Sequence, residues 1–283
     1  CDRTPIDPEP NPTGAKLIFK FKLDSTQTRL NNFGTVATIP AGRAGQSPKF
    51  KSIAAHYIEM IPNALTALGG GEVVYVGKET TQGGSTAIDF DSLKKVGNNE
   101  VFYSVPLSKV KAGNYEYLRV SLAYQKYDIR FKYVYPSLPP FYLTGTLASF
   151  IGYNSYIRNY QINTQSVALN ANKKQGYWGF EVPAQPPYLP SANVSQGEAP
   201  GTTVVNPLFA TSPIPAGSCV VTGKFAQKLN ITGTETKDIV ITVSLSTNKS
   251  FEWIDSNADG EFEPATGETV VDMGIRGMIP IVE

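Results

Sequence analysis

The sequence predicts an all-β protein, an antiparallel β-sandwich with long irregular loops and little helix. Apolar and polar residues alternate in many short stretches, which is the pattern of strands with one buried face. Glycine and proline together supply 25 + 21 = 46 of the 283 residues, so turns are frequent. Sustained helical periodicity is absent. With 41% hydrophobic residues, the chain can bury a sizeable core.

The predicted strands follow in order along the chain. In residues 17–23 large apolar side chains occupy every second position, which places them on one face of a half-buried strand. The same alternation recurs at 118–124, 130–135 and 239–245. Further strands are predicted at 53–61, 72–77, 101–105, 218–225 and 270–275, with glycine-rich turns between several of them.

Two stretches interrupt this pattern and are predicted to be loop insertions in one domain of residues 15–283. The first stretch, residues 133–157, contains no charged side chain. This composition favours a loop or a short helix that covers the core. Residues 183–217 are rich in proline, and long irregular segments of this kind are often functional. For 133–157 the alternative is a surface that touches lipid or a partner. Partner contact is predicted for one or the other stretch, with Phe150 and Tyr188 as the candidate contacts.

Charge and residue counts limit the possible functions. The formal net charge is +1, which gives no electrostatic reason to bind nucleic acid. His56 is the only histidine, so a multi-histidine metal site within one chain is excluded. The two cysteines are Cys1 and Cys219. We expect no disulfide between them, because the position of Cys1 suggests another use for its sulfur. Cys219 is predicted to be a buried, small apolar residue at the start of a strand.

The first fourteen residues differ from the rest. Cys1 is followed by a polar segment with four prolines, which contains too little apolar surface to fold. This start resembles a mature bacterial lipoprotein, in which a lipidated cysteine at residue one precedes a flexible tether. The resemblance implies lipidation of Cys1, a lipid anchor in the membrane and a tether over residues 1–14. The alternative is a chain that merely begins at a cysteine.

An acidic stretch near the carboxyl end has the spacing of a calcium loop. Asp255, Asn257 and Asp259 supply oxygens at the first, third and fifth positions, and the Glu261 carbonyl and Glu263 carboxylate follow at the seventh and ninth. The stretch resembles dockerin-like and thrombospondin-type loops. It departs from the pattern at the twelfth position, Thr266, so Glu268 or Asp272 would have to complete the site. The alternative is a metal-free hairpin turn.

The sequence contains no catalytic signature, and we expect a protein that is not an enzyme. His56 lacks an accompanying nucleophile motif. Glu181, Glu252 and Asp255 are candidate carboxylates for glycan hydrolysis only if the fold brings them together. Trp178 and Trp253 are candidates for sugar stacking, although core packing is the simpler interpretation.

The chain as a whole resembles bacterial outer-membrane surface lipoproteins in its Cys1 start, its first strand, the 250–253 segment before the acidic loop and the 270–277 segment. Residues 16–125 are also similar to the MbnP-like domain, a periplasmic β-sandwich family with copper-linked members. These likenesses imply a lipid-anchored, surface-exposed binding or structural subunit of an envelope complex for nutrient uptake, protein export or outer-membrane protein assembly. Its expected partner is an outer-membrane barrel protein or another subunit, and its expected cofactor is structural calcium. A surface glycan-acting hydrolase or glycan-binding protein is the alternative.

Overall fold

The structure is a computed structural model that describes residues 14–134, 136–187, 189–199, 215 and 217–283. Cys1 and Tyr188 therefore lie outside the described residues. The chain is 56% strand and 4% helix, which confirms the predicted all-β, sandwich-like fold. No helix in the described ranges has the length and apolar character needed to cross a membrane.

The strands are numerous, and most of them are short, as the spacing of turn residues predicts. Their bounds are β1 Lys16–Asp24, β2 Arg43–Gln46, β3 Lys49–Ile61, β4 Glu72–Val76, β5 Glu79–Thr80, β6 Ala87–Asp89, β7 Glu100–Pro106, β8 Gly113–Tyr133, β9 Phe141–Phe150, β10 Asn154–Gln161, β11 Ser166–Lys174, β12 Tyr177–Val182, β13 Asn193–Glu198, β14 Cys219–Ile231, β15 Ile239–Ser246, β16 Phe251–Ile254, β17 Val270–Asp272 and β18 Met278–Val282. Three 3₁₀ turns are described, η1 Phe90–Ser92, η2 Leu107–Lys109 and η5 Pro264–Thr266.

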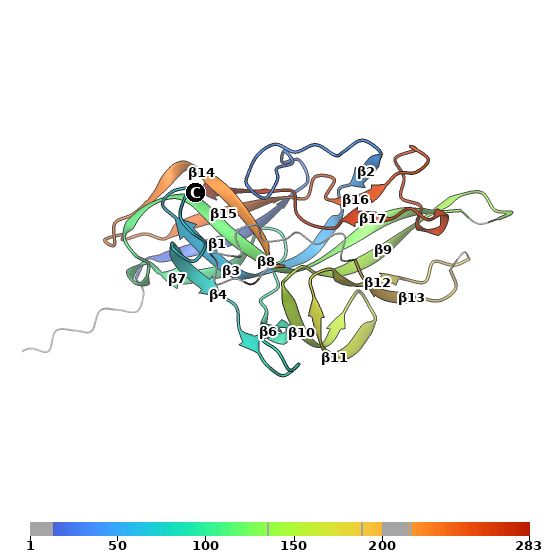
Figure 1. Ribbon diagram of the computed structural model, residues 1–283, viewed down its shortest axis with the longest axis horizontal. Coiled ribbons are helices and arrows are strands. Elements are labelled where there is room, and N and C mark those ends of the chain that lie inside the picture. The colour runs from blue at the N-terminus through green and yellow to red at the C-terminus, as the bar shows by residue number, and fades with distance from the viewer. Residues whose placement is uncertain (1–13, 135, 188, 200–214, 216) are drawn as a thin grey trace, which may run out of the picture.

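A long central sheet organises the molecule. Its order is β13-β12-β9-β8-β3-β4, with β14 also paired to β8. Strand β8 has 21 residues and spans the sheet, so it has different neighbours along its length. Its first half lies between β3 and β14, and its second half pairs with β9. Figure 1 shows the resulting elongated shape, with β14 towards one end and β9, β12 and β13 towards the other.

A second sheet, β18-β15-β1-β7, packs on the first half of the central sheet. The alternating residues Leu17, Phe19 and Phe21 of β1 are fully buried in the core between them, as the sequence pattern predicts. Strand β1 runs parallel to β15 and antiparallel to β7. This sheet is therefore mixed, whereas the sequence predicts antiparallel pairing.

Two smaller sheets cover the rest of the central sheet. The sheet β11-β10-β6-β5 encloses a core rich in tyrosine and phenylalanine around Tyr124 and Phe150. The sheet β17-β16-β2 places Phe251 and Trp253 against the second half of β8. Three large cores of described residues therefore lie along the central sheet, beside a small cluster of Tyr57, Leu68 and Val220. The third large core, around Phe251 and Trp253, is only partly closed.

The prediction of a loop insertion at 133–157 is wrong. Residues 141–150 form β9, and β10 begins at Asn154. Phe150 is fully buried, so the prediction that its side chain contacts a partner is also wrong. In the 183–217 stretch the structure describes one strand, β13, which pairs with β12. The second candidate contact, Tyr188, is not among the described residues.

Candidate functional site: an apolar trough and an acidic loop

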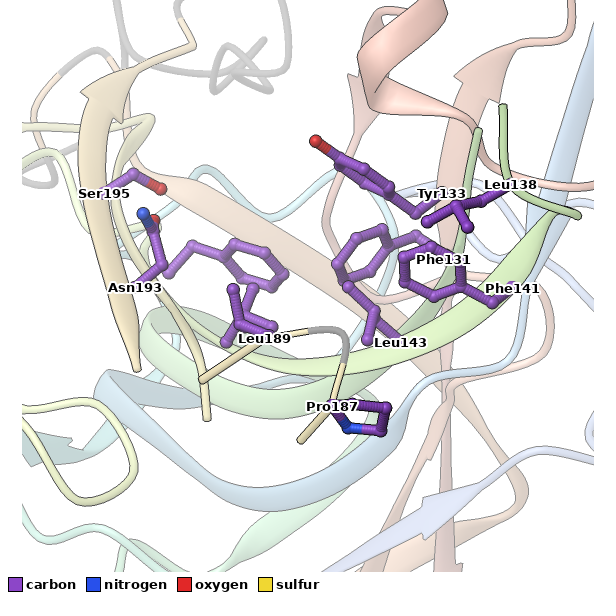
Figure 2. Close-up of a pocket in the computed structure, with 11 residues that line it drawn as sticks. Phe131, Tyr133, Leu138, Phe141, Leu143, Pro187, Leu189, Asn193 and Ser195 are labelled. Atoms are coloured by element: carbon purple, nitrogen blue, oxygen red, sulfur yellow. The ribbon is translucent and has the colours of Figure 1, made fainter. Parts of the chain in front are cut away.

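The open part of the third core forms an apolar trough. It consists of two adjoining cavities of about 770 and 370 Å³ that share Phe131, Phe180 and Ser195. The larger cavity is otherwise lined by Tyr133, Leu138, Phe141, Leu143, Val182, Pro187, Leu189 and Asn193. Figure 2 shows the labelled aromatic and leucine side chains of this cavity converging between two walls. Concave, mostly apolar sites of this size are typical places for ligand binding.

Strand register builds the floor of the trough. Phe131 of β8 is opposite Leu143 of β9, and Phe180 of β12 is opposite Leu147 on one side and Ser195 on the other. Side chains at these paired positions lie on the same face of a sheet, because facing residues point in the same direction. Four neighbouring strands therefore contribute to one surface.

Two glycines make room for the aromatic rings of β12 on this surface. A Cβ atom added to Gly145 would lie 2.2 Å from Cζ of Phe180, and one added to Gly197 would lie 2.8 Å from Cζ2 of Trp178. Each ring therefore lies against a glycine of the neighbouring strand. Any residue with a side chain at that position would clash with the ring.

The trough has little charge. Among the described residues that line the larger cavity none is charged, and the polar groups are Asn193, Ser195 and the hydroxyl of Tyr133. The smaller cavity is lined by one carboxylate, Glu268, which accepts hydrogen bonds from the backbone N–H groups of Ser256 and Glu263. An uncharged, apolar ligand fits this lining, because a charged one would lose its hydration without gaining a partner.

The acidic loop lies beside one rim of the trough and docks on the end of β8. The backbone N–H of Lys132 donates to the Phe262 carbonyl at 2.7 Å. The Lys132 ammonium group lies 2.7 Å from Asp259 and 2.6 Å from Glu263, so a cationic side chain occupies the space between two predicted calcium ligands. These contacts raise the pKa of Lys132.

The other predicted ligands are arranged as follows. Asp255 accepts a hydrogen bond from the Gly260 N–H, and Asn257 accepts one from the Asp259 N–H while its amide donates to Glu263. Glu261 forms a long ion pair with Arg130. Asp272, one suggested substitute for the twelfth position, pairs with Arg276 instead. Across the described ranges no group of three or more His, Cys, Asp or Glu side chains converges as a metal centre.

Calcium binding stays a prediction, and the position of Lys132 sharpens its test. We expect millimolar calcium to raise the melting temperature, because a ligand that binds only the folded state adds about 2.7 kcal/mol at a hundredfold excess over its Kd. Lys132→Met should strengthen this response, since the ammonium group competes for Asp259 and Glu263. Asp255→Ala should abolish it. A melting temperature that is equal in calcium and in chelator, for wild type and Lys132→Met alike, leaves only the metal-free turn.

The other side chains that the sequence singles out for their chemistry are buried. His56 is buried against the ring of Tyr153, and burial lowers its pKa to about 4. Cys219 is a buried free thiol at the start of β14, as predicted, and burial raises its pKa to about 12. Trp253 is fully buried in the core, which confirms the packing interpretation.

The candidate hydrolytic carboxylates are engaged in separate networks. Buried Glu181 accepts hydrogen bonds from the backbone of residues 163–165 and from the Thr164 hydroxyl. Glu252 forms ion pairs with Arg29 and Arg276. Both carboxylates hold loops in place, so neither arrangement favours glycan hydrolysis.

Sequence reasoning did not find the trough. The alternation at 130–135 predicts a strand that contains Phe131, but no sequence pattern places Phe180 beside it. One signal was available, because Trp178 and Phe180 are two residues apart in an aromatic stretch, and this spacing places both rings on one face of a strand. The chain matches no protein-family model, and comparisons with curated proteins and with solved structures gave no match.

Proposed function

We propose that this protein is a lipid-anchored, cell-surface lipoprotein of a bacterial outer membrane. In this proposal it acts as a non-enzymatic binding or structural subunit of an envelope complex, and the trough is its binding site. The observation that carries the proposal is a large uncharged cavity lined by aromatic and leucine side chains. Exposed apolar surfaces of this kind mark sites of interaction in soluble domains.

The position of the trough supports this proposal. One end of the molecule carries β7 and β14, and both the start of β1 and the carboxyl end of the chain lie towards it (Figure 1). Strands β12 and β13 lie towards the opposite end. A tether attached before β1 would leave from the first end. The trough would then face away from the anchoring membrane, where it can reach a partner.

The trough is tested by recovery of a partner from detergent-solubilised envelopes. Ser195 is exposed at the trough, so Ser195→Lys should keep the fold and place a charge on the apolar surface. We expect wild type to recover a barrel protein or other envelope subunit in a fixed ratio and Ser195→Lys to lose it. The matched control is Val76→Lys, an exposed valine on the opposite edge strand β4 of the same sheet. Equal recovery with both variants would show that the trough is not the binding site.

Membrane anchoring is predicted to depend on Cys1, because its sulfur would carry the lipid. In cell fractionation, Cys1→Ser should move most of the exported protein to the soluble fraction. The folded domain should keep its melting temperature, since the sequence of the first fourteen residues has too little apolar surface to form part of a core. Thr4→Ser, a conservative change in the same segment, should stay with the membrane. An exported Cys1→Ser protein that remains membrane-bound, even when Ser195→Lys is added, would contradict lipid anchoring.

A further inference from the structure

Strand β13 is an edge strand without the usual protection. It pairs with β12 through all six of its residues, and no other strand pairs with it in the part of the chain that the structure describes. Five of its six residues are exposed. Natural edge strands are commonly blocked by lysine, proline or a bulge, and β13 contains none of these. One row of backbone N–H and C=O groups therefore faces outward.

This free edge borders the trough. The two β13 residues that line the larger cavity are Asn193 and Ser195, which alternate with Val194 on the other face. Figure 2 shows both at the wall next to Leu189. The apolar floor thus ends at two small polar residues on an open sheet edge. A further strand beside β13 would bring its own side chains over this end of the floor.

We propose that β13 accepts an extended polypeptide segment as an added strand whose alternate apolar side chains enter the trough. This inference rests on the function proposed above and names its partner: a segment with apolar residues at every second position and no charge on that face. Strand addition of this kind takes affinity from main-chain hydrogen bonds and specificity from pockets for alternate side chains. The six residues of β13 offer an edge of about 20 Å.

The free edge selects a polypeptide over a lipid acyl chain. The uncharged lining of the larger cavity suits either ligand. An acyl chain, however, has no donors or acceptors and would leave the outward N–H and C=O groups of β13 paired only with water. A peptide backbone supplies both groups at the spacing of a strand. The other face of β13 is exposed and carries Val194, Gln196 and Glu198. The peptide side chains on that face would also be exposed, so they can be polar.

The test uses a fluorescently labelled peptide of about eight residues, in which phenylalanine or leucine alternates with threonine. Fluorescence anisotropy measures its affinity for the full chain. A second peptide has the same side chains, with backbone N-methyl groups at alternate residues, in both possible phases. We expect the unmodified peptide to bind, and one N-methylated phase to bind at least about tenfold more weakly, because its hydrogen bonds to β13 cannot form. Ser195→Lys should also weaken binding about tenfold or more, whereas Val76→Lys should not.

The outcomes separate this inference from the proposed function. If both N-methylated peptides bind like the parent peptide and Ser195→Lys still weakens binding, the trough binds ligands but strand addition is wrong. If a fluorescent fatty acid binds with the same dependence on Ser195 while the peptide does not bind, the ligand is an acyl chain and the inference is overturned. If neither probe responds to Ser195→Lys, the inference and the proposed role of the trough both fail.

Discussion

Replacing Phe150 with aspartate should unfold the protein at room temperature. The Phe150 ring is fully buried and contacts the rings of Phe90, Tyr124, Tyr160 and Tyr177 at centroid distances of 5.0 to 5.3 Å. The substitution removes these contacts and buries a carboxylate without a cationic partner. Large-to-small changes at such sites alone cost about 3–5 kcal/mol, and the unpaired charge adds to this. Typical domains are stable by only about 5–15 kcal/mol.

Urea denaturation followed by circular dichroism measures this effect. The matched control is Tyr142→Asp on the same strand, because the Tyr142 side chain is exposed and lies over Arg130. We expect that variant to lose at most about 1 kcal/mol. A Phe150→Asp protein that unfolds at the wild-type urea concentration, yet recovers less partner, would mean that Phe150 is a surface contact after all.

Strands with one buried face could be predicted from the sequence, and β1 is the clearest example. Its apolar residues keep period two, because one face packs on the core and the other is partly exposed. Strand β8 was predicted as two strands, at 118–124 and 130–135, although it is continuous from Gly113 to Tyr133. The reason is a register irregularity opposite Ala54 and Ala55 of β3, which shifts the phase of the alternation near Ala123.

Strand β9 could not be predicted by periodicity, because it is buried on both faces. Residues 145–150 are all buried, with the β10 sheet against one side and the β16 sheet against the other. Buried polar residues such as Thr146 and Ser149 interrupt the apolar run. An uncharged stretch without a regular pattern then resembles the sequence of a loop or of a short helix that covers the core. A strand buried on both faces has no alternation to reveal it.

The two candidate sites differ in how far sequence can lead to them. The acidic loop is local, so its oxygen-bearing residues and Gly260 could be found from spacing alone. Lys132, which lies between two of these carboxylates, is 127 residues before Asp259 and could not be found. The trough is built from β8, β9, β12 and β13 and from the β16 region, whose proximity depends on long-range strand pairing. No local motif encodes such a surface.

A second large effect is expected at the buried ion pair of Glu59 and Arg119, which are opposite each other on β3 and β8. Glu59 accepts hydrogen bonds from the N–H groups of Gly69 and Gly71 at 3.0 and 2.7 Å, and Arg119 donates to the Thr66 carbonyl at 2.7 Å. The pair thus holds the 62–71 loop on the sheet. Glu59→Ala leaves a buried guanidinium group without its carboxylate, and we expect a loss of about 3–5 kcal/mol.

A double-mutant cycle shows whether this loss reflects an unpaired charge. The single variants of the cycle are Glu59→Gln and Arg119→Met. Each should destabilise strongly, because Glu59→Gln leaves the buried Arg119 guanidinium without its carboxylate and Arg119→Met leaves the buried Glu59 carboxylate without its cation. The Glu59→Gln/Arg119→Met protein contains neither charge, and its side-chain amide can still accept from Gly71. We therefore expect the double variant to be more stable than the sum of the single losses by about 1–3 kcal/mol. Hydrogen exchange should rise mainly in the 62–71 loop of Glu59→Ala if the protein still folds. Strictly additive losses, with unchanged exchange in that loop, would mean that the two side chains stabilise the sheet independently and do not hold the loop together.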